Sequence, residues 1–150
     1  MPSHEPLSGD GARRHGGRWN PRESFPTVYA GLSISTVEAE FQRLASRAGL
    51  SASSFLPRDL ATIRVVLHEI LDLRDPTTRR SIGLEASELQ SDDVAVTQAI
   101  GEASNLLGFE AILAPSATGV GDVCILLLMN RSSRSSIEVV DRRPYRPDVA

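Results

Sequence analysis

The chain has 150 residues, which is enough for one domain with a sizeable hydrophobic core and too few for two ordinary domains. Apolar residues make up 41% of it and charged residues 23%, a composition typical of soluble globular proteins. A formal net charge of −3 argues against a protein that coats nucleic acid or an anionic membrane.

Three features of the sequence concern its cellular compartment. The single cysteine, Cys124, cannot form an internal disulfide and lies in an apolar run, which indicates a buried thiol in a reducing environment. The first residues are polar and rich in glycine and proline, where a signal peptide would be apolar. The longest apolar run, from Val123 to Met129, is far shorter than the ~20 residues that span a bilayer. We therefore expect a cytoplasmic protein.

The first third of the chain is predicted to contain a loop, a strand and a helix. Residues 1–24 hold seven glycines and prolines and show no regular periodicity, so a loop is predicted. A short strand is expected at residues 27–30. The sequence STVE then matches a capping box, with Ser35 as the N-cap and Glu38 at the third helical position. The apolar spacing that follows predicts an amphipathic helix ending near Gly49.

The middle of the chain is predicted to form two strands and a second helix. An alternating β-branched run indicates a strand at residues 61–67, and a shorter strand is expected at 71–73. Asp92 or Asp93 is placed to cap a helix that ends before Gly108. The apolar residues of that helix are Ala95, Ala99, Ala103, Leu106 and Leu107.

The last third of the chain is rich in predicted strands. Residues 109–114 and 123–129 are apolar runs too short for independent helices, and are expected to be central strands. A last strand is expected at residues 137–140. Helices and strands are mixed and the late strands are crowded together, which predicts an α+β fold rather than a doubly wound sheet.

The segment GGRWNP, residues 16–21, combines residue types that suit an anion-binding loop. Its two glycines allow close approach of the backbone to a ligand. Arg18 supplies a fork of donors that matches a phosphate or a carboxylate, and Trp19 offers a rigid apolar surface that can hold the loop in place. Taken alone, the same segment also fits an arginine stacked on a tryptophan in a surface turn.

Four segments together resemble the RES domain, a family named for its arginine, glutamate and serine. They are SGDGARRHGGRWNP at 8–21, FPTVYA at 25–30, VEAEF at 37–41 and APSATGVGD at 114–122. The resemblance implies one domain over residues 1–150 with an ADP-ribosyltransferase-like α+β fold, a mixed, mainly antiparallel sheet and flanking helices. Residues 1–12 and 143–150 are expected to be peripheral or flexible. The apolar strand common upstream of the family's arginine is not found in the 17 residues before Arg18.

The resemblance also identifies candidate catalytic residues. It places the family's arginine at Arg18, its tyrosine at Tyr29, its glutamate at Glu40 and its serine at Ser116. Glu38 is the rival for the glutamate. The family's spacing from the tyrosine favours Glu40, and Glu38 is already assigned to the predicted capping box. Glu40 lies about 200° further around the helix.

Family knowledge implies that NAD is the substrate, and the chemistry of NAD accounts for these residue types. Nicotinamide leaves as a neutral ring, so no general acid is needed, and the ribose develops oxocarbenium character that one carboxylate can stabilise. Glu40 is expected to hold a ribose hydroxyl and to stabilise that charge. Arg18 is expected to bind the pyrophosphate or an attacking phosphate, and Tyr29 to pack against nicotinamide.

Arg18, Tyr29 and Glu40 are the expected catalytic residues, and four residues are expected to contact the substrate without taking part in catalysis. They are Gly17, Trp19, Asn20 and Ser116. NAD is expected as a substrate and not as a cofactor, with phosphate as a candidate co-substrate. Three scattered histidines and one cysteine offer no metal-ligand spacing.

The resemblance implies a toxin of a toxin–antitoxin pair that depletes NAD by phosphorolysis or hydrolysis. The implied partner is a cognate Xre-like helix-turn-helix antitoxin, with no direct contact to nucleic acid or membrane; homo-oligomerisation stays open. One alternative is an ADP-ribosyltransferase that modifies a protein. Another is an inactive remnant that only binds the antitoxin. The absent first strand favours the remnant, whereas Arg18, Tyr29 and Glu40 argue against it.

Overall fold

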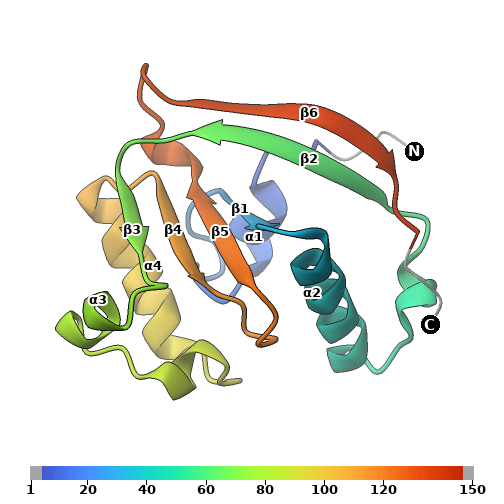
Figure 1. Cartoon of the computed structure of the whole chain (residues 1–150), viewed down its shortest axis with the longest axis horizontal. Helices are drawn as coiled ribbons and strands as arrows, with labels where there is room; N and C mark the ends of the chain where they lie inside the picture. The colour runs from blue at the N-terminus through green and yellow to red at the C-terminus, as the bar shows by residue number, and fades with distance from the viewer. Residues whose placement is uncertain (1–4, 147–150) are drawn as a thin grey trace.

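The computed structural model describes residues 5–146, which form a four-stranded sheet, a two-stranded ribbon and surrounding helices (Figure 1). The sheet has the order β1–β5–β4–β3. Its strands are β1 (Thr27–Gly31), β5 (Asp122–Leu127), β4 (Ala111–Pro115) and β3 (Ile70–Asp72). Strand β5 is antiparallel to both neighbours, and β3 is parallel to β4. The α+β class is confirmed, and the two apolar runs expected to be central strands form the inner strands of this sheet.

The two-stranded ribbon consists of β2 (Asp59–Val66) and β6 (Ser136–Pro144). The two strands are antiparallel, with a register shift between Thr62 and Ile63. In Figure 1 the ribbon arches over the four-stranded sheet. The strand predicted at 137–140 is therefore part of a longer one.

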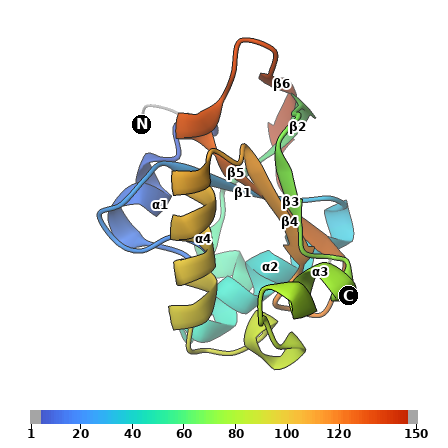
Figure 2. The ribbon, with the colours of Figure 1, turned by 90° about the vertical axis from the view of Figure 1, so that its left-hand side faces the viewer.

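The helices lie beside and at one end of the four-stranded sheet. They are α1 (Asp10–His15), α2 (Ile34–Arg47), α3 (Pro76–Ser81) and α4 (Ala95–Leu107), with 3-10 turns η1 (Ala52–Phe55), η2 (Ala86–Leu89) and η3 (Leu128–Asn130). Helices α1 and α4 cover the same face of the sheet (Figure 2). None of the helices within residues 5–146 has the length and apolar character needed to cross a bilayer.

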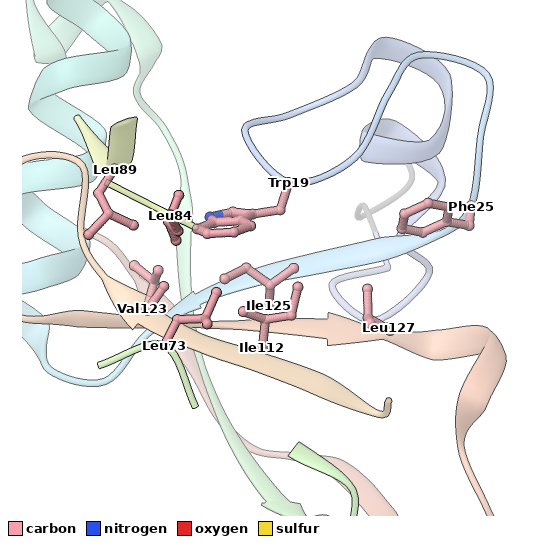
Figure 3. Close-up of a cluster of buried hydrophobic side chains, with 10 residues drawn as sticks. Trp19, Phe25, Leu73, Leu84, Leu89, Ile112, Val123, Ile125 and Leu127 are labelled. Carbon is pink, nitrogen blue, oxygen red and sulfur yellow. The ribbon is translucent and has the colours of Figure 1, made fainter. Parts of the chain in front are cut away.

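The core lies on both faces of the four-stranded sheet, because successive side chains of a strand point to opposite faces. The odd-numbered residues in 123–127 belong to a cluster beneath the buried Trp19 (Figure 3). Cys124 and Leu126 belong to a second cluster, against which partly buried residues of the ribbon pack. The sheet is thus held between the ribbon on one side and the Trp19 loop with α4 on the other.

The prediction of a loop throughout residues 1–24 is wrong for α1. Asp10 forms ion pairs with Arg13 and Arg14 at 2.7 and 2.9 Å, three and four residues along the helix. Gly9 and Gly16 flank the helix with positive φ angles of 66° and 78°. Because α1 buries none of its residues, it has no apolar periodicity that the sequence could reveal.

The starts of α2 and α4 both use side-chain acceptors. The expectation of Ser35 as N-cap is wrong: Ser33 caps α2, and its hydroxyl accepts the backbone N–H of Thr36 at 3.2 Å. The expectation that Asp92 or Asp93 caps α4 is also wrong: Val94 is the N-cap, and Asp93, one residue earlier, accepts the backbone N–H of Ala95 at 3.0 Å.

The face of α4 that packs on the protein is not its most apolar face. The helix buries Thr97, Gly101 and Ser104, whereas its alanines and leucines are exposed. A Cβ atom added at Gly101 would lie 1.6 Å from the carbonyl oxygen of Trp19. The loop that carries Trp19 therefore touches the helix backbone, and only small side chains fit between them.

Both ends of the chain were expected to be peripheral. Residues 10–12 lie in α1, and residues 143–144 lie in β6, where Arg143 is paired with Leu60. Residues 5–9 and 145–146 are also described, and Tyr145 is buried, whereas residues 1–4 and 147–150 lie outside the described part of the chain.

Replacing Gly101 with alanine is expected to lower the free energy of unfolding by about 1–3 kcal/mol, because the new methyl group forces the helix and the Trp19 loop apart. Urea denaturation measures this change. Gly11→Ala is the matched control: Gly11 is also helical, and an added Cβ meets nothing within 4 Å. The control is expected to be neutral or slightly stabilising, and equal stability of the two variants would contradict the close contact.

Candidate functional site

A cavity of about 160 Å³ lies where the ends of β1 and β4 and the start of β5 meet α2. Arg18, Tyr29 and Glu40 all contribute to its wall, together with Pro115 and Ala117. The three residues come from separate elements: the loop before β1, β1 itself and α2. The structure therefore brings the three predicted catalytic residues to one cavity.

The loop that carries Arg18 is anchored to α4 and to the segment before it. The carbonyl of Arg18 accepts the Thr97 hydroxyl at 2.6 Å, and the Gln98 amide donates to the carbonyl of Gly17 at 2.9 Å. The Arg18 guanidinium donates to the carbonyl of Ser91 at 2.8 Å. These contacts fix the backbone of the loop and leave the remaining guanidinium donors available for a ligand.

The charge on Arg18 is surrounded by other charges. Burial lowers the pKa of its guanidinium from the ordinary value, and the nearby cations Arg43 and Arg47 lower the pKa further. The carboxylates of Glu40 and Asp92 raise the pKa of Arg18. Arginine keeps its proton in proteins, so this part of the cavity is a region of positive potential.

Tyr29 is held by its hydroxyl and leaves part of its ring free. The hydroxyl donates to Oδ1 of Asn20 at 2.6 Å and accepts the backbone N–H of Trp19 at 2.9 Å. Burial raises the pKa of the phenol above its ordinary value. The side chain is still 39% exposed, which leaves ring surface available to a flat ligand.

Glu40 is bound by Ser116 across the cavity wall. The Ser116 hydroxyl donates to Oε1 of Glu40 at 2.6 Å. The backbone N–H of Thr118 donates to the same serine oxygen at 3.1 Å. Ser116 is fully buried, so it orients the carboxylate rather than facing the cavity.

The cavity distinguishes between the two candidate acids. Glu40 contributes to its wall and Glu38 does not. The capping-box argument against Glu38 is wrong, because Ser33 caps α2. The preference for Glu40 therefore rests on its place in the cavity and on its bond to Ser116.

The other residues expected to contact substrate mainly support the site. Trp19 reaches the cavity wall but is only 2% exposed, and its indole lies in the core (Figure 3). Asn20 is fully buried and donates to the carbonyl of Ala12 at 2.7 Å. A Cβ atom at Gly17 would lie 2.6 Å from the Tyr29 hydroxyl, so the glycine allows that hydroxyl to reach the loop.

Sequence reasoning did not single out Arg43, and it considered Asp92 only as a helix cap. The Arg43 guanidinium donates to the carbonyl of Ala117, a residue of the cavity wall, at 2.9 Å. It also lies 3.6 Å from the Asp92 carboxylate. Arg43 follows Glu40 by three residues on α2, and this spacing is the signal that was available in the sequence.

Comparisons with known proteins find one family model and several relatives that resemble this chain. A model of the RES domain family matches residues 2–148. NAD(+) phosphorylase MbcT from Mycobacterium tuberculosis, and the protein of that name from Mycobacterium bovis, are each 41% identical over 117 residues. The match covers 77% of this chain and 63% of each relative, so the chain spans less than two thirds of their length. A chain in the crystal structure of the M. tuberculosis MbcT–MbcA toxin–antitoxin complex superposes with a TM-score of 0.88 at 32% identity, over 97% of this chain and 80% of that one.

Tyr29→Phe is expected to lower the free energy of unfolding by about 1–3 kcal/mol, because it leaves the buried Asn20 oxygen and the Trp19 N–H without their partner. The effect also depends on pH. The raised pKa means that the phenol's stabilising contribution is complete below pH ~10 and is lost as the pH rises through the folded-state pKa.

Urea denaturation of wild type and Tyr29→Phe at neutral pH and above pH 10 measures both effects. The difference between the two proteins is expected to shrink at the higher pH. A difference that stays constant would show that the phenol is not held in its neutral form by the fold.

Proposed function

The chain belongs to the RES domain family, and from that premise we propose that it cleaves NAD at the bond between nicotinamide and ribose. The observation that carries the proposal is the convergence of Arg18, Tyr29 and Glu40 on one cavity. The hydrogen bond from Ser116 to Glu40 gives that cavity a single, oriented carboxylate. The names of the mycobacterial relatives support phosphate as the acceptor.

The proposed reaction suits a site with one oriented carboxylate. Nicotinamide departs as a neutral ring, so the bond breaks without a general acid. Positive charge develops on the ribose, and the Glu40 carboxylate stabilises it while accepting a hydrogen bond from a ribose hydroxyl. Ser116 is a positioning residue, because it acts through Glu40.

With phosphate as the acceptor, the reaction needs no reactant other than NAD and phosphate. A phosphate oxygen attacks C1′ of the ribose as the C–N bond breaks, which gives nicotinamide and the 1-phosphate of the ADP-ribose. Arg18 holds either the incoming phosphate or the pyrophosphate of NAD, since its guanidinium matches both. Tyr29 presents its free ring surface to nicotinamide.

The proposed biological role is that of a toxin whose cognate antitoxin covers the cavity. The resemblance to a chain of the MbcT–MbcA toxin–antitoxin complex supports such a partner. We assign the antitoxin to the Xre-like helix-turn-helix class and the pair to the cytoplasm, where the NAD pool that a toxin depletes is found. Any homo-oligomerisation would come in addition to this pairing.

Incubation of the purified protein with NAD is expected to release nicotinamide, measured by chromatography, at a rate that rises with phosphate concentration. Release without phosphate would indicate hydrolysis instead. Transfer of label from NAD to protein would indicate ADP-ribosylation. Absence of release under all conditions would contradict the proposal and favour an inactive antitoxin-binding module.

Glu40→Gln is expected to lower kcat by about a hundredfold, because the neutral amide cannot stabilise the charge on the ribose. Glu38→Gln is the matched control: it is the same change on the same helix, outside the cavity wall, and should leave kcat within about twofold, since surface substitutions rarely disturb the fold. An equal loss of kcat in both variants, or full activity of Glu40→Gln, would show that Glu40 is not the catalytic carboxylate.

A cognate antitoxin is expected to inhibit nicotinamide release when it is co-purified with this chain. A candidate antitoxin would be a helix-turn-helix protein encoded by an adjacent gene, and the measurements are complex formation by size-exclusion chromatography and the rate of nicotinamide release. A stable complex with undiminished release would contradict an antitoxin that covers the cavity.

A further inference from the structure

Arg18, Arg43 and Arg47 form a cluster of cations beside the cavity, and one carboxylate, that of Asp92, is shared between the last two. We propose that these three arginines bind a phosphoryl oxyanion, for which the Asp92 carboxylate competes. The identity of the ligand rests on the proposed function: it is either the pyrophosphate of NAD or inorganic phosphate. The oxyanion site itself follows from the geometry of the cluster.

Helix α2 leads from the cavity outward along one face. Glu40, Arg43 and Arg47 are spaced by three and four residues, so their side chains lie one above the other. Glu40 lines the cavity, and Arg43 donates to the carbonyl of Ala117 in the same wall. The exposed fraction of the side chain rises from 26% at Arg43 to 54% at Arg47. A ligand that leaves the cavity along this face meets the two cations in turn.

The third cation, Arg18, contacts the segment that also carries Asp92. Its guanidinium donates to the carbonyl of Ser91, and the carboxylate of the next residue, Asp92, lies 3.6 Å from Arg43 and 3.9 Å from Arg47. Residues 91–92 therefore bridge Arg18 and the α2 arginines. The three guanidiniums also interact electrostatically, because Arg43 and Arg47 both lower the pKa of Arg18.

The ion pairs of Asp92 with Arg43 and Arg47 are weak enough for a bound anion to replace them. The side chain is 85% exposed, and both distances exceed the ~2.7–2.9 Å of a charge-assisted hydrogen bond. Exposed ion pairs of this kind contribute little to stability. Near the cluster, three guanidiniums face two carboxylates, those of Asp92 and Glu40, so one positive charge remains in excess. A phosphate with two negative charges matches the cluster better than Asp92 does.

The size of the cavity indicates which part of a bound dinucleotide the arginine cluster would contact. A volume of about 160 Å³ is well below the ~300–1,000 Å³ of sites that enclose a drug-sized ligand. A dinucleotide would therefore extend beyond the cavity, and the roles proposed for Glu40 and Tyr29 place its nicotinamide end inside. The phosphoryl groups then lie outside the cavity, where Arg43 and Arg47 supply planar donor forks.

Calorimetric titration of the full chain with inorganic phosphate and, separately, with pyrophosphate tests the oxyanion site without any turnover. Arg43→Gln is expected to weaken binding by about tenfold. Asp92→Asn is expected to tighten it by about threefold, because it removes the competing charge. Arg64→Gln is the control, since Arg64 pairs with Glu138 on the ribbon at 3.1 Å, and its binding should match wild type.

The two main variants are expected to change anion affinity in opposite directions, which separates an effect on binding from an effect on folding. A purely structural role predicts lower thermal stability for Arg43→Gln and tighter binding for neither variant. Asp92 is exposed, so Asp92→Asn keeps the test valid even if Arg43→Gln folds poorly. Unchanged affinity in both variants, or no binding of either anion by wild type, would overturn the proposal.

Steady-state kinetics of nicotinamide release identifies which anion is bound. A rise in KM for phosphate alone in Arg43→Gln assigns the cluster to the co-substrate, and a rise in KM for NAD alone assigns it to the pyrophosphate. Arginine-dependent anion binding without nicotinamide release would refute the proposed function and keep the oxyanion site. Nicotinamide release with both KM values unchanged in Arg43→Gln and Asp92→Asn would refute the oxyanion site and keep the proposed function.

Discussion

The contact between the Trp19 backbone and α4 determines where Arg18 can lie. Gly101 allows the carbonyl of Trp19 to touch the helix, and Thr97 binds the carbonyl of Arg18 one turn earlier. With the backbone fixed in this way, the indole of Trp19 enters the core and the guanidinium of Arg18 reaches the cavity. The loop that carries Arg18 is therefore part of the packing of the hydrophobic core, and a change in the packing of α4 acts on the cavity through the loop backbone.

The position of Glu40 in the cavity wall also depends on close packing, in this case between α2 and the turn before β5. Thr36 is fully buried in the first turn of α2, and a Cβ atom at Gly121 would lie 2.1 Å from its hydroxyl. The turn that leads into β5 thus lies directly against the start of α2. Ser116 belongs to the same turn region, and so its hydroxyl comes within 2.6 Å of Glu40 one helical turn further along. Two small residues, Gly101 and Gly121, set the distance between the two halves of the site.

The sequence was sufficient to predict most strands and which residues meet at one cavity, and it was insufficient where the outcome depended on packing. The central strands follow from short apolar runs, and the resemblance to the RES domain singled out Arg18, Tyr29 and Glu40, which the structure brings to one cavity. Helix α1 was missed because it has no buried face and its stability comes from charge pairs. The buried face of α4 was missed because a backbone contact selects small side chains over apolar ones, and the pattern of hydrophobicity does not record that choice. The cap of α2 was displaced by two residues for a related reason, since the buried Thr36 fixes the first turn.

The positions of the two arginines on α2 have different structural explanations. This difference makes Arg43 the more informative residue for testing the proposed oxyanion site. Arg47 is the last residue of the helix, where a cation is favoured by the helix dipole whether or not a ligand binds. Arg43 lies in the interior of the helix with its side chain 26% exposed, so it gains little from the dipole. Its guanidinium contacts the Ala117 carbonyl in the cavity wall and lies 3.6 Å from a carboxylate that is itself 85% exposed. Because the helix end accounts for Arg47 but not for Arg43, substitution of Arg43 reports more directly on the proposed oxyanion site.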